Sequence, residues 1–295
     1  MSEHDEKAPG IHWSYRITQA IFTFAATICF VIFWCAGQML GIPAEPGHGG
    51  SLVSQPTVGR AMAGLAAAAV LLVGCTLFSH AFLRRRWFMA SLAAATAGFS
   101  AWSMRGGPSG DVFRYAPSVA VFVRLALELI FLGATVGAVW TFLWREQPGG
   151  KPLARGESIA AVLQHTAIMG ILVFLLVQTD AKKQCVVSVF VAALISASIV
   201  RANWSRPEAG KWFWIAPILV GVIGYVLAAF QSGDWNSGMR ELTGFAAPLA
   251  RPLPLDYASV GMFGSLLGYW MNSPEEGTEE SEDKQPGASP ASLAS

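Results

Sequence analysis

Long apolar runs that recur along most of the chain are the feature that most constrains its fold. A helix crosses the hydrocarbon core of a bilayer with about 20 mostly apolar residues, and about 17–25 are accepted. We interpret eight segments as spans, and because the third, sixth and eighth are the shortest, seven spans is the fallback. The sequence therefore predicts an all-α, polytopic transmembrane helical bundle with helices at residues 17–40, 61–83, 87–104, 118–144, 158–179, 184–201, 212–231 and 255–271.

The composition favours a membrane location. Of the 295 residues, 53% are hydrophobic and only 13% are charged. Soluble domains carry about 25% charged residues, so lipid must cover much of this protein's surface. The formal net charge is +1, and the chain has no basic cluster of the kind that binds nucleic acid. We therefore expect the lipid bilayer as the main partner, another membrane protein as a further candidate, and no nucleic acid.

The chain divides into three parts. Residues 1–16 are polar, residues 17–271 form the transmembrane domain, and residues 272–295 form an acidic tail with many Pro, Gly and Ser residues. The first apolar run is longer than the core of a signal peptide, which has about 7–15 residues, so we expect it to remain as the first span. Dense like charge and low hydrophobicity predict that the tail is disordered.

The distribution of Lys and Arg predicts the orientation. Cytoplasmic loops of membrane proteins carry an excess of these residues. With the N-terminus inside, twelve of the twenty Lys and Arg residues fall on the inner side, seven fall on the outer side, and Arg124 lies within a span. This count predicts that both termini are cytoplasmic, with the basic triplet at residues 84–86 as the strongest anchor. Because no organelle signal is evident, we expect a plasma or inner membrane.

Small residues four positions apart occur on three of the predicted helices. This spacing lets helix backbones approach closely in lipid, so we expect tight packing at these sites. The pairs are Gly64 with Ala68, Gly133 with Gly137, and Gly264 with Gly268.

Charged residues inside the membrane mark the first candidate site, because such residues are costly there and are retained mainly for function. Arg124 and Glu128 are four residues apart in the fourth span, a spacing that places them on one helical face within reach of an ion pair. One interpretation is a substrate, ion or proton site that opens to the outer face; the other is a self-neutralised pair that fixes the helix against its neighbours. Asp256 lies at the predicted outer rim, where a polar vestibule would also include Arg251, Arg240, Glu241, Asp111 and Arg114.

Two histidines lie within predicted helices at similar depths. His80 is in the second span and His165 in the fifth, and two imidazoles on different helices can ligate a haem iron from both sides. The sequence shows none of the signatures of nucleotide-binding loops, zinc proteases or dinucleotide-binding folds. We therefore assign no catalytic residue and no metal site, and we regard an enzymatic role as the weaker expectation.

Two functional classes follow from these features. The first is an integral membrane protein that binds or moves a small solute, ion or lipid at a site near Arg124, Glu128 and Asp256. The second is an accessory or scaffold subunit of a membrane complex, without enzymatic activity. A haem-binding redox protein that uses His80 and His165 is a distant third, and the sequence does not identify a cofactor.

Overall fold

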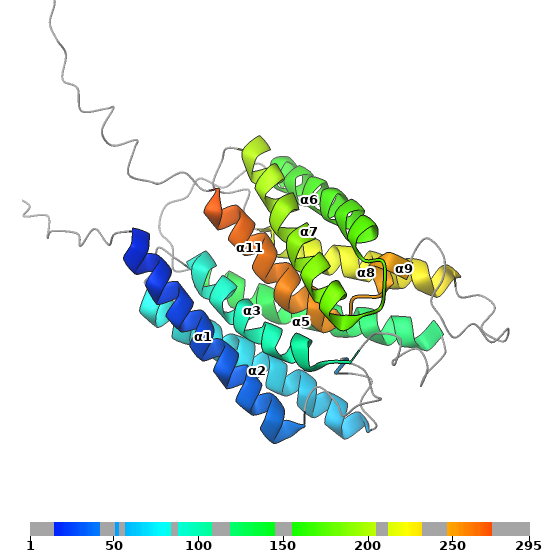
Figure 1. Cartoon of the computed structure of the whole chain (residues 1–295), viewed down its shortest axis with the longest axis horizontal. Helices are drawn as coiled ribbons and strands as arrows, with labels where there is room; N and C mark the ends of the chain where they lie inside the picture. The colour runs from blue at the N-terminus through cyan, green and yellow to red at the C-terminus, as the bar shows by residue number, and fades with distance from the viewer. Residues whose placement is uncertain are drawn as a thin grey trace, which may run out of the picture.

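The computed structural model describes residues 15–41, 51–52, 57–83, 88–107, 119–144, 155–204, 212–231 and 247–272. Every regular element within these ranges is helical (Figure 1). Nearly all of the predicted disordered tail and of the polar N-terminal segment lies outside the described residues. The elements are α1 (Tyr15–Leu40), α2 (Val58–Leu83), α3 (Phe88–Arg105), α5 (Val119–Trp144), α6 (Arg155–Leu176), α7 (Lys182–Asn203), α8 (Ile215–Gln231), α9 (Ala247–Ala250), α10 (Pro254–Asp256), the π-helical segment η4 (Tyr257–Gly261) and α11 (Met262–Met271).

Five helices are long and apolar enough to cross a membrane. Together with the helical character of every described element, this finding fits the predicted helical membrane protein. The other three predicted segments, residues 87–104, 212–231 and 255–271, are also largely helical. The total number of membrane spans and the orientation of the protein in the membrane stay predictions. The five spans are Ile17–Leu40, Val58–Leu83, Val119–Leu143, Glu157–Leu176 and Lys182–Asn203.

Two central helical segments are covered by the other helices. One is α3, and the other is the continuous segment formed by α10, η4 and α11. Helix α3 packs against α1 and α2 on one side and against α11 on the other, and α7 in turn packs against α11. A helix surrounded by protein can carry more small and polar residues than one that faces lipid. This explains why α3, which is rich in alanine and serine, is helical without qualifying as an independent span.

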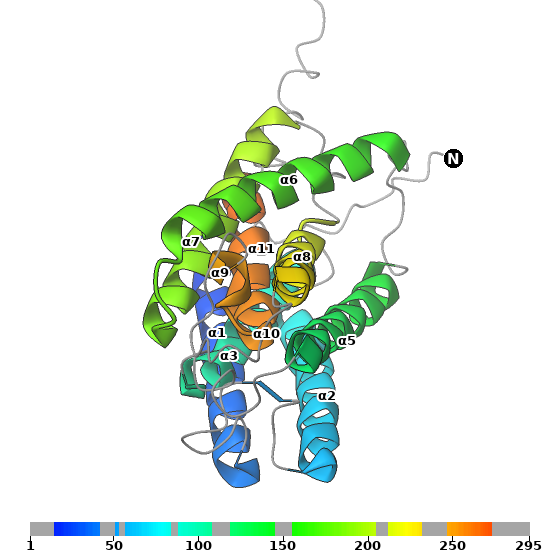
Figure 2. The same cartoon turned by 90° about the vertical axis from the view of Figure 1, so that its right-hand side faces the viewer.

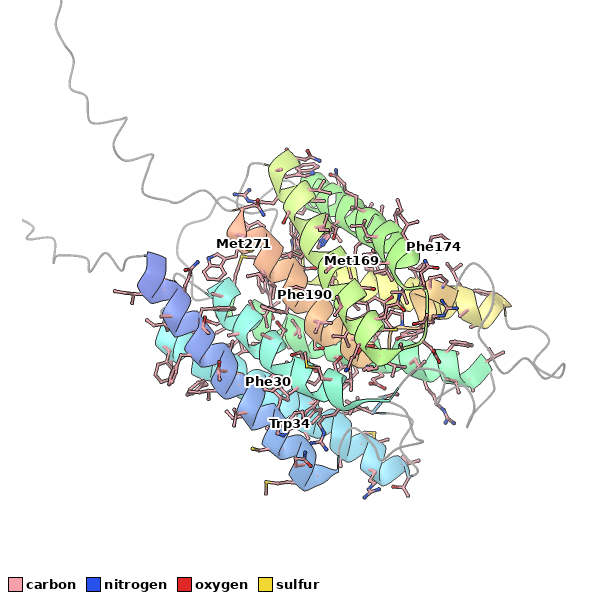
Figure 3. All side chains as sticks on the ribbon, viewed as in Figure 1. Phe30, Trp34, Met169, Phe174, Phe190 and Met271 are labelled. Carbon is pink, nitrogen blue, oxygen red and sulfur yellow. The ribbon has the colours of Figure 1, made fainter. Side chains whose placement is uncertain are left out.

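The outer helices present apolar side chains on their outward faces. Phe30 stacks on Trp34 along α1, with ring centroids 6.2 Å apart (Figure 3). Phe190 on α7 instead packs inward against Phe263 of α11, at 5.5 Å. Helices α5 and α8 pack against each other and run at a steep angle to α1, α3, α7 and α11 (Figures 1 and 2). An apolar exposed surface of this kind is what lipid requires.

Small residues permit the close approach of helices at two of the three predicted pairs. A Cβ atom added to Gly264 would lie 2.6 Å from the carbonyl oxygen of Phe190, and one added to Gly268 would lie 2.5 Å from that of Leu194. The predicted pair on α11 therefore brings its backbone into direct contact with α7. A Cβ atom added to Gly133 would lie 3.2 Å from the side chain of Ile218 on α8, and one added to Gly137 would lie 3.0 Å from that of Trp214, just before α8, so packing is tight at this pair as well.

The two ends of the bundle collect different residues. Phe22 near the start of α1 contacts Trp270 near the end of α11, with ring centroids 5.1 Å apart, so these two helix termini share one end. At the opposite end, the guanidinium of Arg105 lies 5.5 Å from the ring centroid of Trp34. We call the first the Trp270 end. Lys182 at the start of α7 lies at the second end, because it and Ser103 near the end of α3 both contact Asp256, and we call this the Lys182 end. The Lys182 end is the one that the charge distribution predicts to face outward.

Candidate functional site

A partly buried ion pair lies at the Lys182 end. The carboxylate oxygen Oδ1 of Asp256 is 2.5 Å from Nζ of Lys182 and also accepts a hydrogen bond from Oγ of Ser103 at 2.5 Å. The other carboxylate oxygen, Oδ2, accepts from the backbone amide of Leu253 at 2.9 Å. Three elements therefore meet at one carboxylate: the end of α3, the start of α7 and the start of the last helical segment.

The local sequence explains the position of Asp256. Pro254 stands at the first position of the helix, where the missing N–H of proline is tolerated and its fixed φ is favourable. Asp256 is two residues further on, and its side chain accepts the otherwise unsatisfied amide of Leu253. The helix continues at once into the π-helical segment η4, all of which is buried. Single π-helical turns are frequent at functional sites, so this irregularity sets the segment apart from a plain span.

The pair is open to the surface on its lysine side. The Lys182 side chain is 12% exposed, whereas that of Asp256 is 1% exposed. Two charges removed from water are costly unless their geometry and hydrogen bonds are good, and removal of one partner leaves the other uncompensated. The arrangement therefore holds a carboxylate inside the protein with a counter-ion that reaches toward the surface. Arg251, which was predicted at the rim, donates from Nη1 to the carbonyl oxygens of Val177 and Gln178 at 3.3 and 2.7 Å, beyond the end of α6.

Glu128 is a second buried carboxylate at this end of the bundle, with 1% of its surface exposed. It accepts a hydrogen bond from Oγ of Ser51 at 2.6 Å and from the backbone amide of Leu52 at 3.1 Å. Ser51 and Leu52 are themselves fully buried, although they lie in the connection between α1 and α2. A part of this connection therefore enters the bundle and contacts α5.

The predicted pairing of Arg124 with Glu128 is not what the structure shows. Arg124 is exposed, and the contacts described for Glu128 come from Ser51 and Leu52. The reason lies in helix geometry, since positions four apart are rotated by about 40° around the axis. Arg124 shares the outward face of α5 with Val123 and Leu127, whereas Glu128 falls on the inward face.

The two carboxylates lie in one region of the fold. Helix α5 contacts both α10 and η4. The hydroxyl of Tyr225 on α8 donates to the carbonyl oxygen of Pro252, four residues before Asp256, at 2.6 Å. The hydroxyl of Tyr257 likewise donates to the carbonyl oxygen of Leu249 at 2.7 Å. The site thus combines two carboxylates, one ammonium and several hydroxyl groups, which suits the binding of a cation or of a polar solute.

Replacing Ser51 with alanine is expected to lower the free energy of unfolding by about 1 kcal/mol, because it removes one hydrogen bond to a buried carboxylate. Reversible unfolding of the purified protein in detergent measures this loss. Thr135 is a suitable control on α5, since its hydroxyl donates only to the carbonyl oxygen of Phe131 in the same helix. We expect Thr135→Ala to change stability by less than about 0.5 kcal/mol. An equal loss in the two variants would contradict a specific contact at Ser51.

The two histidines lie in different parts of the bundle. Nε2 of His165 is 3.4 Å from Oγ of Ser265, and its ring centroid is 4.9 Å from that of Phe213. His80 is on α2, which packs against α1, α3 and α5, whereas α6 packs against α7, α8 and α9. Figures 1 and 2 show α2 and α6 on opposite sides of the bundle. The structure therefore does not bring the two imidazoles together around a haem.

Four predicted rim residues lie outside the described residues: Asp111, Arg114, Arg240 and Glu241.

Sequence reasoning missed Lys182 and Ser103 as partners of Asp256. The dipeptide of Lys182 and Lys183 at the start of a span was a usable signal, because a lysine there can turn inward toward a carboxylate. No comparable signal marked Ser103.

Comparison of the chain with protein-family models, with curated proteins and with solved structures finds no match.

Proposed function

We propose that this integral membrane protein binds and moves a small cation or a polar solute that bears a positive charge. Asp256 is the carboxylate that holds the charge, and Lys182 is the counter-ion that the ligand displaces. The observation that carries this proposal is the ion pair itself, in which a buried carboxylate is neutralised by an ammonium that reaches the surface. Ionisable groups inside a membrane protein are expensive and commonly mark pathways for ions and substrates.

The contacts of Asp256 support an exchange of this kind. A proton, a metal cation or the ammonium group of a solute can take the place of the Lys182 Nζ atom without disturbing the other contacts. Ser103 and the amide of Leu253 would continue to donate to the carboxylate and keep its orientation. Lys182 would move toward the surface, to which its side chain is already partly open. Glu128 would be the second carboxylate on the path, and the segment of Ser51 and Leu52 would have to release it.

The alternative function is that of an accessory or scaffold subunit. Its support is the set of exposed apolar side chains on the outer helices. Lipid requires the same surface, so these side chains do not by themselves favour a protein partner. The buried ion pair is the more specific observation, and it favours a binding role.

Asp256→Asn is expected to abolish stabilisation by the ligand while the protein still folds, because the amide keeps the shape but lacks the charge. The assay is the thermal midpoint of purified protein with protons, sodium, potassium, primary amines and amino acids as probes. A ligand present at 100 times its Kd stabilises by about 2.7 kcal/mol, which is readily measured. Asp180→Asn is the control, since Asp180 is exposed near the same end. The proposal fails if no probe stabilises the wild type, or if Asp256→Asn is stabilised equally.

A further inference from the structure

The end of α7 opposite Lys182 carries a buried cation, Arg201. Arg201 lies 19 positions after Lys182 on the same helix, a distance of about 28 Å along its axis. This separation is close to the thickness of a bilayer core, which is about 30 Å. Arg201 is only 3% exposed. The helix therefore has one cation near each of its ends, of which Arg201 is the more deeply buried.

The contacts of Arg201 leave one edge of its guanidinium unused. Nη1 donates to the carbonyl oxygen of Trp204 at 2.8 Å, and the guanidinium carbon lies 5.0 Å from the ring centroid of Tyr269. Nε is buried and has no hydrogen-bond partner within the described part of the chain. Trp204 is itself fixed, because its Nε1 donates to Oε1 of Gln164 on α6 at 2.8 Å. The remaining edge, formed by Nε and Nη2, is the fork that binds an oxyanion through two parallel hydrogen bonds.

Within the described residues, the charge of Arg201 has no counter-ion. The ion pair observed there is that of Lys182 with Asp256, and no carboxylate of the described ranges is paired with Arg201. A cation buried in a membrane protein without a counter-ion is unfavourable. The contact with the face of Tyr269 and one carbonyl oxygen offset only a part of this cost. A bound anion would supply the counter-charge that the described residues do not provide.

We infer that Arg201 binds a phosphate-type oxyanion at the Trp270 end, through the Nε–Nη2 edge of its guanidinium. The ring of Tyr269 and the tethered Trp204 hold the guanidinium in place. Either the headgroup of an anionic phospholipid or free inorganic phosphate supplies this chemistry. The predicted cytoplasmic position of this end fits a lipid headgroup, because anionic lipids are enriched in the cytoplasmic leaflet. This site is independent of the one at Asp256 in position, in residues and in ligand charge.

The test is binding of two probes, phosphatidylglycerol and inorganic phosphate, to delipidated protein in detergent. Native mass spectrometry counts bound phosphatidylglycerol, and the thermal midpoint reports on both probes. We expect Arg201→Gln to weaken binding at least tenfold. We expect Arg201→Lys to weaken it as well, because lysine keeps the charge and lacks the fork. Binding of phosphatidylglycerol alone identifies a lipid site, whereas binding of inorganic phosphate that displaces the lipid identifies a site for the free anion.

Arg105→Gln is the matched control. Arg105 also lies over a tryptophan ring and donates to a carbonyl oxygen, that of Trp34 at 3.5 Å, but at the Lys182 end. We expect this variant to bind both probes as the wild type does. The inference is overturned if the wild type binds neither probe, or if Arg201→Lys and Arg201→Gln bind as tightly as the wild type. Arg201→Lys retains the charge, so it decides the question even if Arg201→Gln does not fold.

Discussion

Replacing Lys182 with methionine is expected to lower the free energy of unfolding by about 3–5 kcal/mol, because it leaves the buried carboxylate of Asp256 without its counter-ion. Methionine has nearly the length of lysine, so the packing around the stem of the side chain is largely preserved. The loss therefore reports on charge rather than on volume. Reversible unfolding of purified protein in mixed detergent micelles measures it.

Two further variants make this prediction specific. Lys183→Met changes the neighbouring lysine, which is exposed, and is expected to alter stability by less than about 0.5 kcal/mol. The double variant Lys182→Met with Asp256→Asn removes both charges and keeps groups that can hydrogen-bond with Ser103 and Leu253. It is expected to recover most of the stability lost in the single variant. A double variant as unstable as Lys182→Met would contradict the ion pair as the cause.

Replacing Gly98 with leucine is expected to destabilise the protein by about 3 kcal/mol, at the upper end of the usual cost of overpacking. A Cβ atom at this position would lie 2.7 Å from the carbonyl carbon of Cys29 and 2.9 Å from the backbone nitrogen of Phe30. Backbone atoms cannot move aside as a flexible side chain can. Helix α1 would therefore have to separate from α3, which is one of the two central segments. The same unfolding measurement detects the loss.

Gly74 in α2 provides the control for this substitution. A Cβ atom added there meets nothing within 4 Å, so Gly74→Leu is expected to be tolerated and even slightly stabilising, since leucine is the better helix former. If the two glycine variants were destabilised by the same amount, close approach of α1 and α3 at Gly98 would not be the reason.

The positions of the helices follow from the sequence because the lipid sets one dominant rule. A span needs a long apolar run, and such runs are visible in the sequence without knowledge of the fold. The first predicted segment, residues 17–40, coincides with the helical stretch Ile17–Leu40, which is long and apolar enough to cross a membrane. The rule does not predict that α3 is a central helix rather than one that faces lipid. The burial of α3 by α1, α2 and α11 depends on how the helices assemble, which a count of apolar residues does not reveal. The irregular start of the last helix, with its π-helical segment, was likewise invisible to a count of apolar residues.

The sequence predicted the two carboxylates of the candidate site but not the residues that contact them. Glu128 and Asp256 were recognised because a carboxylate beside or within an apolar run is conspicuous. Their partners were missed because they are far away along the chain: Lys182 is 74 positions and Ser103 is 153 positions from Asp256. Sequence spacing reveals only local pairs, and this is why Arg124 was matched to Glu128. The actual contact of Glu128 with Ser51 spans 77 positions.

The measurement that tests the central claim most directly is the charge displacement in proteoliposomes adsorbed on a solid-supported membrane. A rapid jump in the concentration of protons, sodium, potassium or a primary amine is expected to produce a transient current in the wild type. The current should saturate with concentration and should be absent in Asp256→Asn, because the carboxylate that receives the charge is gone. Absence of a current in the wild type for every probe, or an equal current in Asp256→Asn, would contradict a cation site at Asp256 and Lys182.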